Sequence, residues 1–192
     1  MAVIKNILAV FGLIVILAGG VISISAASIM SEFSPDAPSA YAAFVSRLLA
    51  SKDPGVSLVY SVPVKEGITY DSLKKSFKSL AKQNNVLYTG ERDFYKQLEA
   101  RSGKPHRLIS FISFCHPKSG EMISDYNDAY TAFMPSRIAV VEDKHGKLWL
   151  HTMRLDLMIY GGKPLPPELK AEGLHVWNTT RDIMLAAAAG DF

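Results

Sequence analysis

The stretch Arg107–Cys115, RLISFISFC, decides the fold, because it is apolar along nearly its whole length. A short apolar run bounded by turn residues is typical of a strand buried inside a sheet. The next residues, His116–Gly120, read HPKSG and contain the proline and glycine that end such a strand. We therefore expect Arg107–Cys115 to lie in the interior of a sheet.

Further strands are predicted on both sides of this stretch. Val56–Val64 alternates apolar with polar residues, as half-buried strands do, and Pro63 lacks an N–H, which places it at a sheet edge. Val86–Tyr88 predicts a short strand. Ile138–Val141 and Lys147–Leu155 flank a polar turn and predict a hairpin.

Helical spacing predicts helices between these strands. Tyr70–Gln83 follows the capping residue Thr69 and turns its apolar residues to one side and its lysines to the other. Asp93–Arg101 and Met122–Phe133 show similar spacing. Helices and hairpins are mixed rather than strictly alternating. This order favours the α+β class, a two-layer domain with a mixed or antiparallel sheet and packed helices.

Two short motifs stand at the ends of predicted strands. The apolar strand closes in Ser113–Pro117, SFCHP, and the later strand begins in Met134–Asp143, MPSRIAVVED. With the order of elements, these motifs resemble the DUF302 family, a domain of unknown function, which shows a Cys-Asn-Pro-like sequence at the first position and a Leu-Pro-Cys-like start at the second. The resemblance covers residues 56–160 and implies a small, often self-associating α+β domain without established chemistry. His116 replaces the common asparagine and Ser136 the second cysteine, which argues against a dithiol role.

An uncharged apolar run, Ile7–Ala27, precedes this domain. As a helix it would be about 30 Å long, enough to cross a bilayer. We predict a transmembrane anchor in residues 1–30, with a cleaved signal peptide as the alternative. Lys5 lies before the run and the next basic residue is Arg47, so we expect the domain to be exported. The predicted location is a bacterial inner membrane, crossed once, with the C-terminal domain in the periplasm.

Three small residues within the run, Gly19, Ser23 and Ala27, recur at every fourth position and predict a packing face for another membrane helix. Residues 31–55 then predict a linker and an amphipathic neck helix. The apolar face of this helix could lie on the membrane surface, on a partner or on the domain itself. Because the helix has few basic residues, we favour packing on protein over packing on the membrane surface. The apolar face contains Tyr41, Phe44, Val45, Leu48 and Leu49.

Residues 161–192 predict a proline-rich arm followed by a closing helix, Arg181–Ala189. The closing helix would dock either on its own sheet or on another subunit.

The candidate ligand-binding residues are Cys115, His116 and His151. Cys115 is the only cysteine, which excludes an internal disulfide, a zinc ribbon and a covalently attached c-type haem. A thiolate near an imidazole can act as a nucleophile or a metal ligand. Neighbours in a strand point to opposite faces, however, so we interpret Cys115 as a buried small residue and His116 as part of a turn. A copper site is the sharpest chemical alternative, but the Cys-His spacing does not fit it. We predict no catalytic residue, no metal and no cofactor.

Two functions from different classes fit these features. The net charge of +3 is mild and gives no sign of nucleic-acid binding. We favour a non-enzymatic accessory subunit or interaction protein of a larger membrane complex, for example a respiratory or electron-transfer complex. Its partners would be integral membrane proteins or further copies of the chain. The alternative is a periplasmic protein that uses Cys115 and His116 for redox chemistry or for binding a metal, a haem or a sulfur compound.

Overall fold

The computed structural model describes residues 5, 11–13, 16 and 28–192. The predicted transmembrane anchor falls almost entirely outside these residues, as do Gly19, Ser23 and Ala27 of the predicted packing face. Among the described residues, no helix is long and apolar enough to span a membrane.

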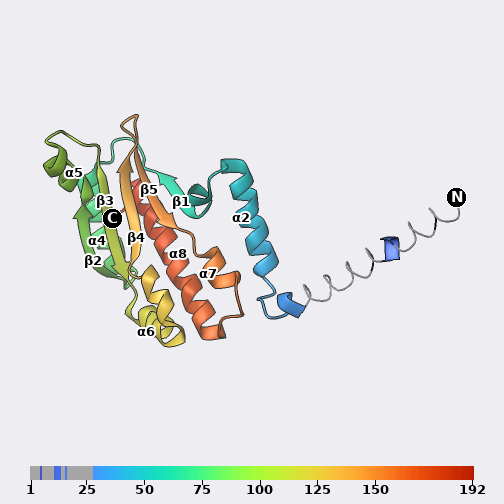
Figure 1. Ribbon diagram of the computed structural model, residues 1–192. Helices are drawn as coiled ribbons and strands as arrows, with labels where there is room; N and C mark the ends of the chain where they lie inside the picture. The colour runs from blue at the N-terminus through green and yellow to red at the C-terminus, as the bar shows by residue number, and fades with distance from the viewer. Residues whose placement is uncertain (1–4, 6–10, 14–15, 17–27) are drawn as a thin grey trace.

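Five antiparallel strands form one sheet in the order β1-β5-β4-β3-β2 (Figure 1). The predicted apolar strand is β3, and it lies inside the sheet between β2 and β4. The predicted hairpin is formed by β4 and β5. The strands are β1 (Val59–Pro63), β2 (Leu87–Asp93), β3 (Ile109–Cys115), β4 (Ser136–Glu142) and β5 (Leu148–Met153).

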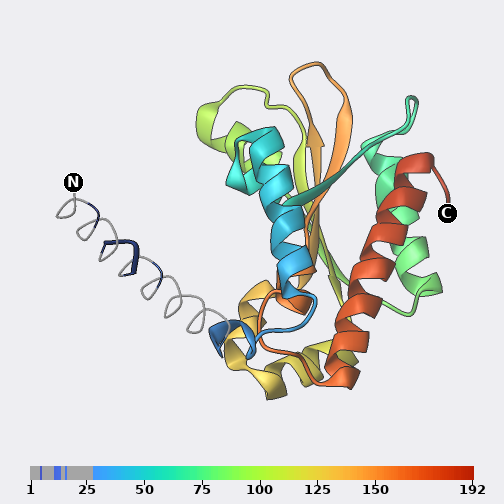
Figure 2. The same cartoon turned by 90° about the vertical axis from the view of Figure 1, so that its right-hand side faces the viewer.

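Two helices, α4 (Tyr70–Gln83) and α8 (Pro167–Ala189), cover one face of the sheet (Figure 2). α5 (Phe94–Ser102) lies on the opposite face, and α2 (Ala37–Ser51) and α3 (Pro54–Ser57) lie beside the β1 edge. The predicted α+β class is therefore confirmed, with an antiparallel sheet. At one end of the sheet lie α6 (Pro117–Tyr126), the 3-10 helix η1 (Asp128–Phe133) and α7 (Asp156–Tyr160).

The core lies between the sheet and the pair α4 and α8. Alternate residues of the strands point into it, including Ile112, Phe114 and Leu150. Thr69 caps α4 as predicted, since its side chain accepts a hydrogen bond from the Ser72 N–H. The apolar face of α4 is buried and that of α8 completes the core. The helical core residues are Leu73, Phe77, Leu80, Ala81, Ile183, Met184, Ala187 and Ala188.

Several element boundaries differ from the predictions. β1 begins at Val59 rather than Val56, because the Asp53 carboxylate caps the short helix α3. β2 continues to Asp93 along β3. The helix predicted over Met122–Phe133 is two helices, because Asn127 ends α6 and caps η1.

The C-terminal region is one long helix, so the predicted arm with a helix from Arg181 is wrong. Pro167 occupies the first turn of α8, where a missing N–H costs no hydrogen bond. Gly173 lies inside this helix, where an added Cβ would contact Ile159 at 3.4 Å. The closing helix docks on its own sheet.

The neck helix α2 has a proline in its first turn and turns only part of its predicted apolar face toward the domain. Ala37 and Ala40 are buried, whereas Tyr41, Val45 and Leu49 are 44%, 45% and 72% exposed. Of the three surfaces that could receive the apolar face, the domain therefore does not cover these three side chains, whereas Phe44 and Leu48 of the same face are half-buried. α2 packs against α3 and α7.

Both edges of the sheet carry an irregularity. Pro63 ends β1, as predicted for an edge strand. β2 contains a bulge between Tyr88 and Gly90, and Gly90 has a φ of 146° that side-chain-bearing residues rarely adopt.

Candidate functional site

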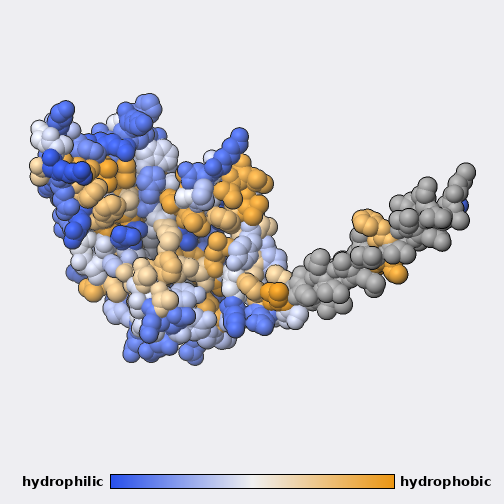
Figure 3. Space-filling model, in the orientation of Figure 1, coloured by the Kyte–Doolittle hydropathy of each residue, from blue (hydrophilic) through white to orange (hydrophobic). Residues whose placement is uncertain are grey.

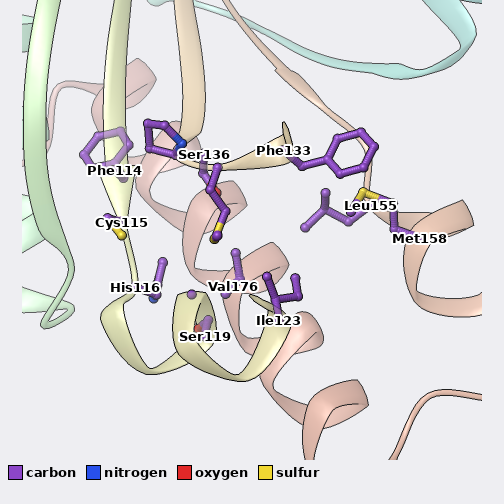
Figure 4. A pocket seen from close by; sticks show the side chains of 13 residues that line it. Phe114, Cys115, His116, Ser119, Ile123, Phe133, Ser136, Leu155, Met158 and Val176 are labelled. Atoms are coloured by element: carbon purple, nitrogen blue, oxygen red, sulfur yellow. The ribbon is translucent and has the colours of Figure 1, made fainter. Parts of the chain in front are cut away.

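Cys115 and His116 line the same small cavity at the end of β3 (Figure 4). Cys115 is the last residue of the strand and lies on the face opposite the core residue Phe114. His116 already lies outside the strand, where Pro117 starts α6. The pleat therefore no longer sets the direction of the imidazole, and both neighbours can line one cavity. The cavity has a volume of about 70 Å³.

α8 brings a second histidine to this site. The rings of His116 and His175 meet edge to face, with centroids 5.8 Å apart. One turn earlier on α8, the Glu172 carboxylate accepts a 2.6 Å hydrogen bond from the Ser119 hydroxyl and pairs with Lys118 at 3.5 Å. The polar side of the site thus joins the start of α6 to α8.

The charges of the site follow from these contacts. Burial lowers the pKa of His116, and the charge of His175 lowers it further, while Glu172 opposes both to a smaller extent. The hydrogen bond from Ser119 lowers the pKa of Glu172, and Lys118 acts in the same direction. At neutral pH the site therefore presents a neutral His116 imidazole and an ionised Glu172.

The rest of the cavity is mostly apolar. Side chains from α6, η1, α7 and α8 form most of its wall, and Ser119 and Ser136 are the polar residues that line it beside the thiol and the imidazole. A small, weakly polar molecule matches this lining better than a charged one. The apolar wall residues include Phe114, Ile123, Phe133, Leu155, Met158 and Val176.

His151 lies at a separate position on β5. Its Nδ1 is 2.8 Å from the Ser61 hydroxyl, and its ring stacks on Trp149 with centroids 6.3 Å apart. Burial lowers the pKa of His151. It lines a larger open hollow of about 670 Å³ on the sheet, together with Phe111 and Met153. Of the three candidate residues, the structure brings Cys115 and His116 together and keeps His151 apart.

His175 was not among the three predicted candidate residues. In the structure it lies beside His116, whereas His151 does not. The sequence signal for it depends on α8 being one continuous helix, because only then does His175 fall on the turn that follows Glu172. Within residues 28–192 and the few described before them, no group of three or more His, Cys, Asp and Glu residues is arranged to hold a metal ion.

The fold and the site together define a two-layer α+β domain with a thiol and an imidazole at the end of an interior strand. The chain matches the family described as domain of unknown function DUF302 over residues 60–184, and it belongs to this family. The match begins in β1 and ends in α8, so α8 belongs to the family domain and α2 precedes it.

A solved structure supports the same fold. The crystal structure of an uncharacterized conserved DUF302 protein from Bacillus stearothermophilus is similar to this chain, with a TM-score of 0.56 and 13% sequence identity. The similarity covers 68% of this chain and 98% of that chain. No curated protein matches the chain.

Proposed function

We propose that this protein is a membrane-anchored, exported and non-catalytic subunit that attaches its α+β domain to a larger membrane complex. The run Ile7–Ala27 would be the anchor, in a bacterial inner membrane with the domain in the periplasm. The observation that carries the proposal is the way the domain is fastened to the segment that follows this run.

Four contacts join residues 32–47 to the domain. The Ser34 N–H donates to the Gly162 carbonyl at 2.7 Å. Lys170 pairs with Asp36 at 2.7 Å, Lys163 with Glu32 at 3.8 Å and Arg47 with Asp156 at 3.1 Å. Each exposed ion pair contributes little alone, but the four contacts act on one short segment together with the packing of α2 on α7. The domain would therefore keep a fixed orientation to its anchor, as a subunit that docks on a neighbour requires.

The test is purification from native membranes in a mild detergent through a C-terminal tag on the full chain, followed by size exclusion, mass spectrometry and absorption spectroscopy. We expect integral membrane proteins in constant ratio to the chain. Arg47→Met together with Asp36→Ala should reduce the recovered partners, because they loosen the fastening. Recovery of the chain without any other membrane protein would contradict the proposal.

A second function is favoured by the cavity that Cys115 and His116 share with the neighbouring His175. A small redox-active or weakly polar ligand would meet the thiol and the neutral imidazole there. The same purification tests it, since a bound chromophore or metal would be lost in Cys115→Ala and His116→Ala. If both variants keep their partners and show no spectral change, the ligand-binding function is wrong.

A further inference from the structure

We infer that α2 is a homodimer interface, in which its exposed face packs in parallel against the same face of a second copy. The inference rests on the proposed function in one respect, because the anchor would hold both copies in one membrane. α2 lies before residue 60 and so outside the part of the chain that matches the family.

Two neighbouring rows of side chains run along the exposed face of α2. Large apolar side chains form one row at every fourth residue, Tyr41, Val45 and Leu49. The row beside it contains only small residues, Ala42, Ser46 and Ala50, and all three are exposed. Figure 3 shows hydrophobic surface over the C-terminal end of α2 and the adjoining α3, where Val56 is also exposed.

A ridge of large side chains beside a groove of small ones is complementary to itself. When two such helices pack with a twofold axis between them, each ridge enters the other groove, at a crossing angle of about −50°. A different partner would need the reverse arrangement on its own surface, whereas a second copy supplies it automatically.

The charges of α2 also favour a second copy over lipid. Its one basic residue within the helix, Arg47, faces inward, donates to the Ser57 carbonyl at 3.0 Å and pairs with Asp156. The exposed face between Asp36 and Lys52 therefore has no charge, so two copies of a chain with net charge +3 meet there without repulsion. Helices that lie on membranes usually carry lysine and arginine on the polar face, which α2 lacks.

The size of the exposed face of α2 sets the expected affinity of the dimer. A helix of 15 residues is about 22 Å long and about 10 Å wide. This contact is smaller than the ~800 Å² per partner of a standard interface, so we expect a weak dimer in dilute detergent. In a membrane the two α2 helices would lie at the same height, since both follow the same anchor at the same distance along the chain.

Disulfide cross-linking in native membranes tests the pairing. In a full-length Cys115→Ser background, which removes the only native thiol, Ala42→Cys and Ser46→Cys are introduced one at a time. In the proposed pair both positions lie in the groove that receives the partner's ridge, close to the twofold axis, so both should give oxidised dimers. Lys75→Cys on the exposed side of α4 is the control and should stay monomeric. Dimers at Ser46→Cys but not at Ala42→Cys would overturn the parallel arrangement.

A charge on the large row should abolish the cross-link. Leu49→Glu, added to Ala42→Cys, buries a carboxylate in the interface and should remove the dimer band. Leu185→Glu on α8 is the matched control, because Leu185 is also helical and exposed (45%), and it should leave the band unchanged.

The remaining outcomes separate this inference from the proposed function. If neither cysteine gives a dimer, the interface is wrong. In that case a nitroxide spin label at position 49 shows what covers the face. Collisions of the label with oxygen, but not with an aqueous nickel complex, would assign the face to lipid. Alkaline extraction of the same membranes reports the anchor independently, so a membrane-bound monomer contradicts only the dimer and a released chain contradicts the anchor.

Discussion

His116 is the residue whose surroundings couple the candidate site to pH. Its ring is surrounded by the apolar wall of the cavity and by His175, and both lower its pKa. The folded state therefore favours the neutral imidazole. Between the folded pKa and the ordinary value of 6.5, the unfolded chain binds more protons than the folded one, so stability falls as pH falls through this range.

Replacing His116 should weaken this pH dependence. We expect the free energy of unfolding of the wild type to fall between about pH 7.5 and about pH 5.5. In His116→Gln the fall should be smaller, by up to about 1 kcal/mol. The measurement is urea unfolding at both pH values. His145→Gln in the exposed β4–β5 turn is the control and should behave as the wild type. Equal losses in all three proteins would show that His116 is not responsible.

At the scale of single elements, the parts with a strong local pattern were predictable. Thr69 and the spacing of Leu73 and Phe77 identify α4, and apolar residues on both sides of a polar turn identify the β4–β5 hairpin. The start of α8 was not predictable from the sequence, because the prolines before it are typical of an extended arm. The helix begins at Pro167 only because it packs on the sheet. His175 was missed for the same reason.

The sequence also did not predict that Cys115 and His116 share a cavity. Strand periodicity fixes Cys115 but gives no direction for His116, because the strand ends between them. Two of the three candidate residues therefore line one cavity, and α8 adds His175 beside them.

The role of α8 in the core can be tested with two adjacent residues. Met184 is fully buried in the core that α4, α8 and the sheet share, while Leu185 is 45% exposed. Met184→Ala should lower the free energy of unfolding by about 2–5 kcal/mol, because it leaves a cavity. Leu185→Ala should change it by less than about 1 kcal/mol. Equal effects in urea unfolding would mean that α8 does not complete the core.

At the scale of the whole molecule, α2 links the domain to the segment before it, and Arg47 is the side chain that fastens α2. Arg47→Met should lower the overall stability by about 1 kcal/mol and increase amide hydrogen exchange across residues 37–51, while α4 stays protected. Arg181→Met is the control, since Arg181 pairs with its chain neighbour Asp182. Unchanged exchange in α2 would show that packing on α7 holds it without the ion pair.

The irregular edges of the sheet have a consequence for neighbouring copies of the domain. A regular edge strand offers unpaired N–H and C=O groups on which a neighbouring chain can grow into a fibril. Pro63 removes one of these N–H groups from β1, and the bulge at Gly90 breaks the straight line of β2. Neighbouring copies are thereby protected against aggregation through their sheets.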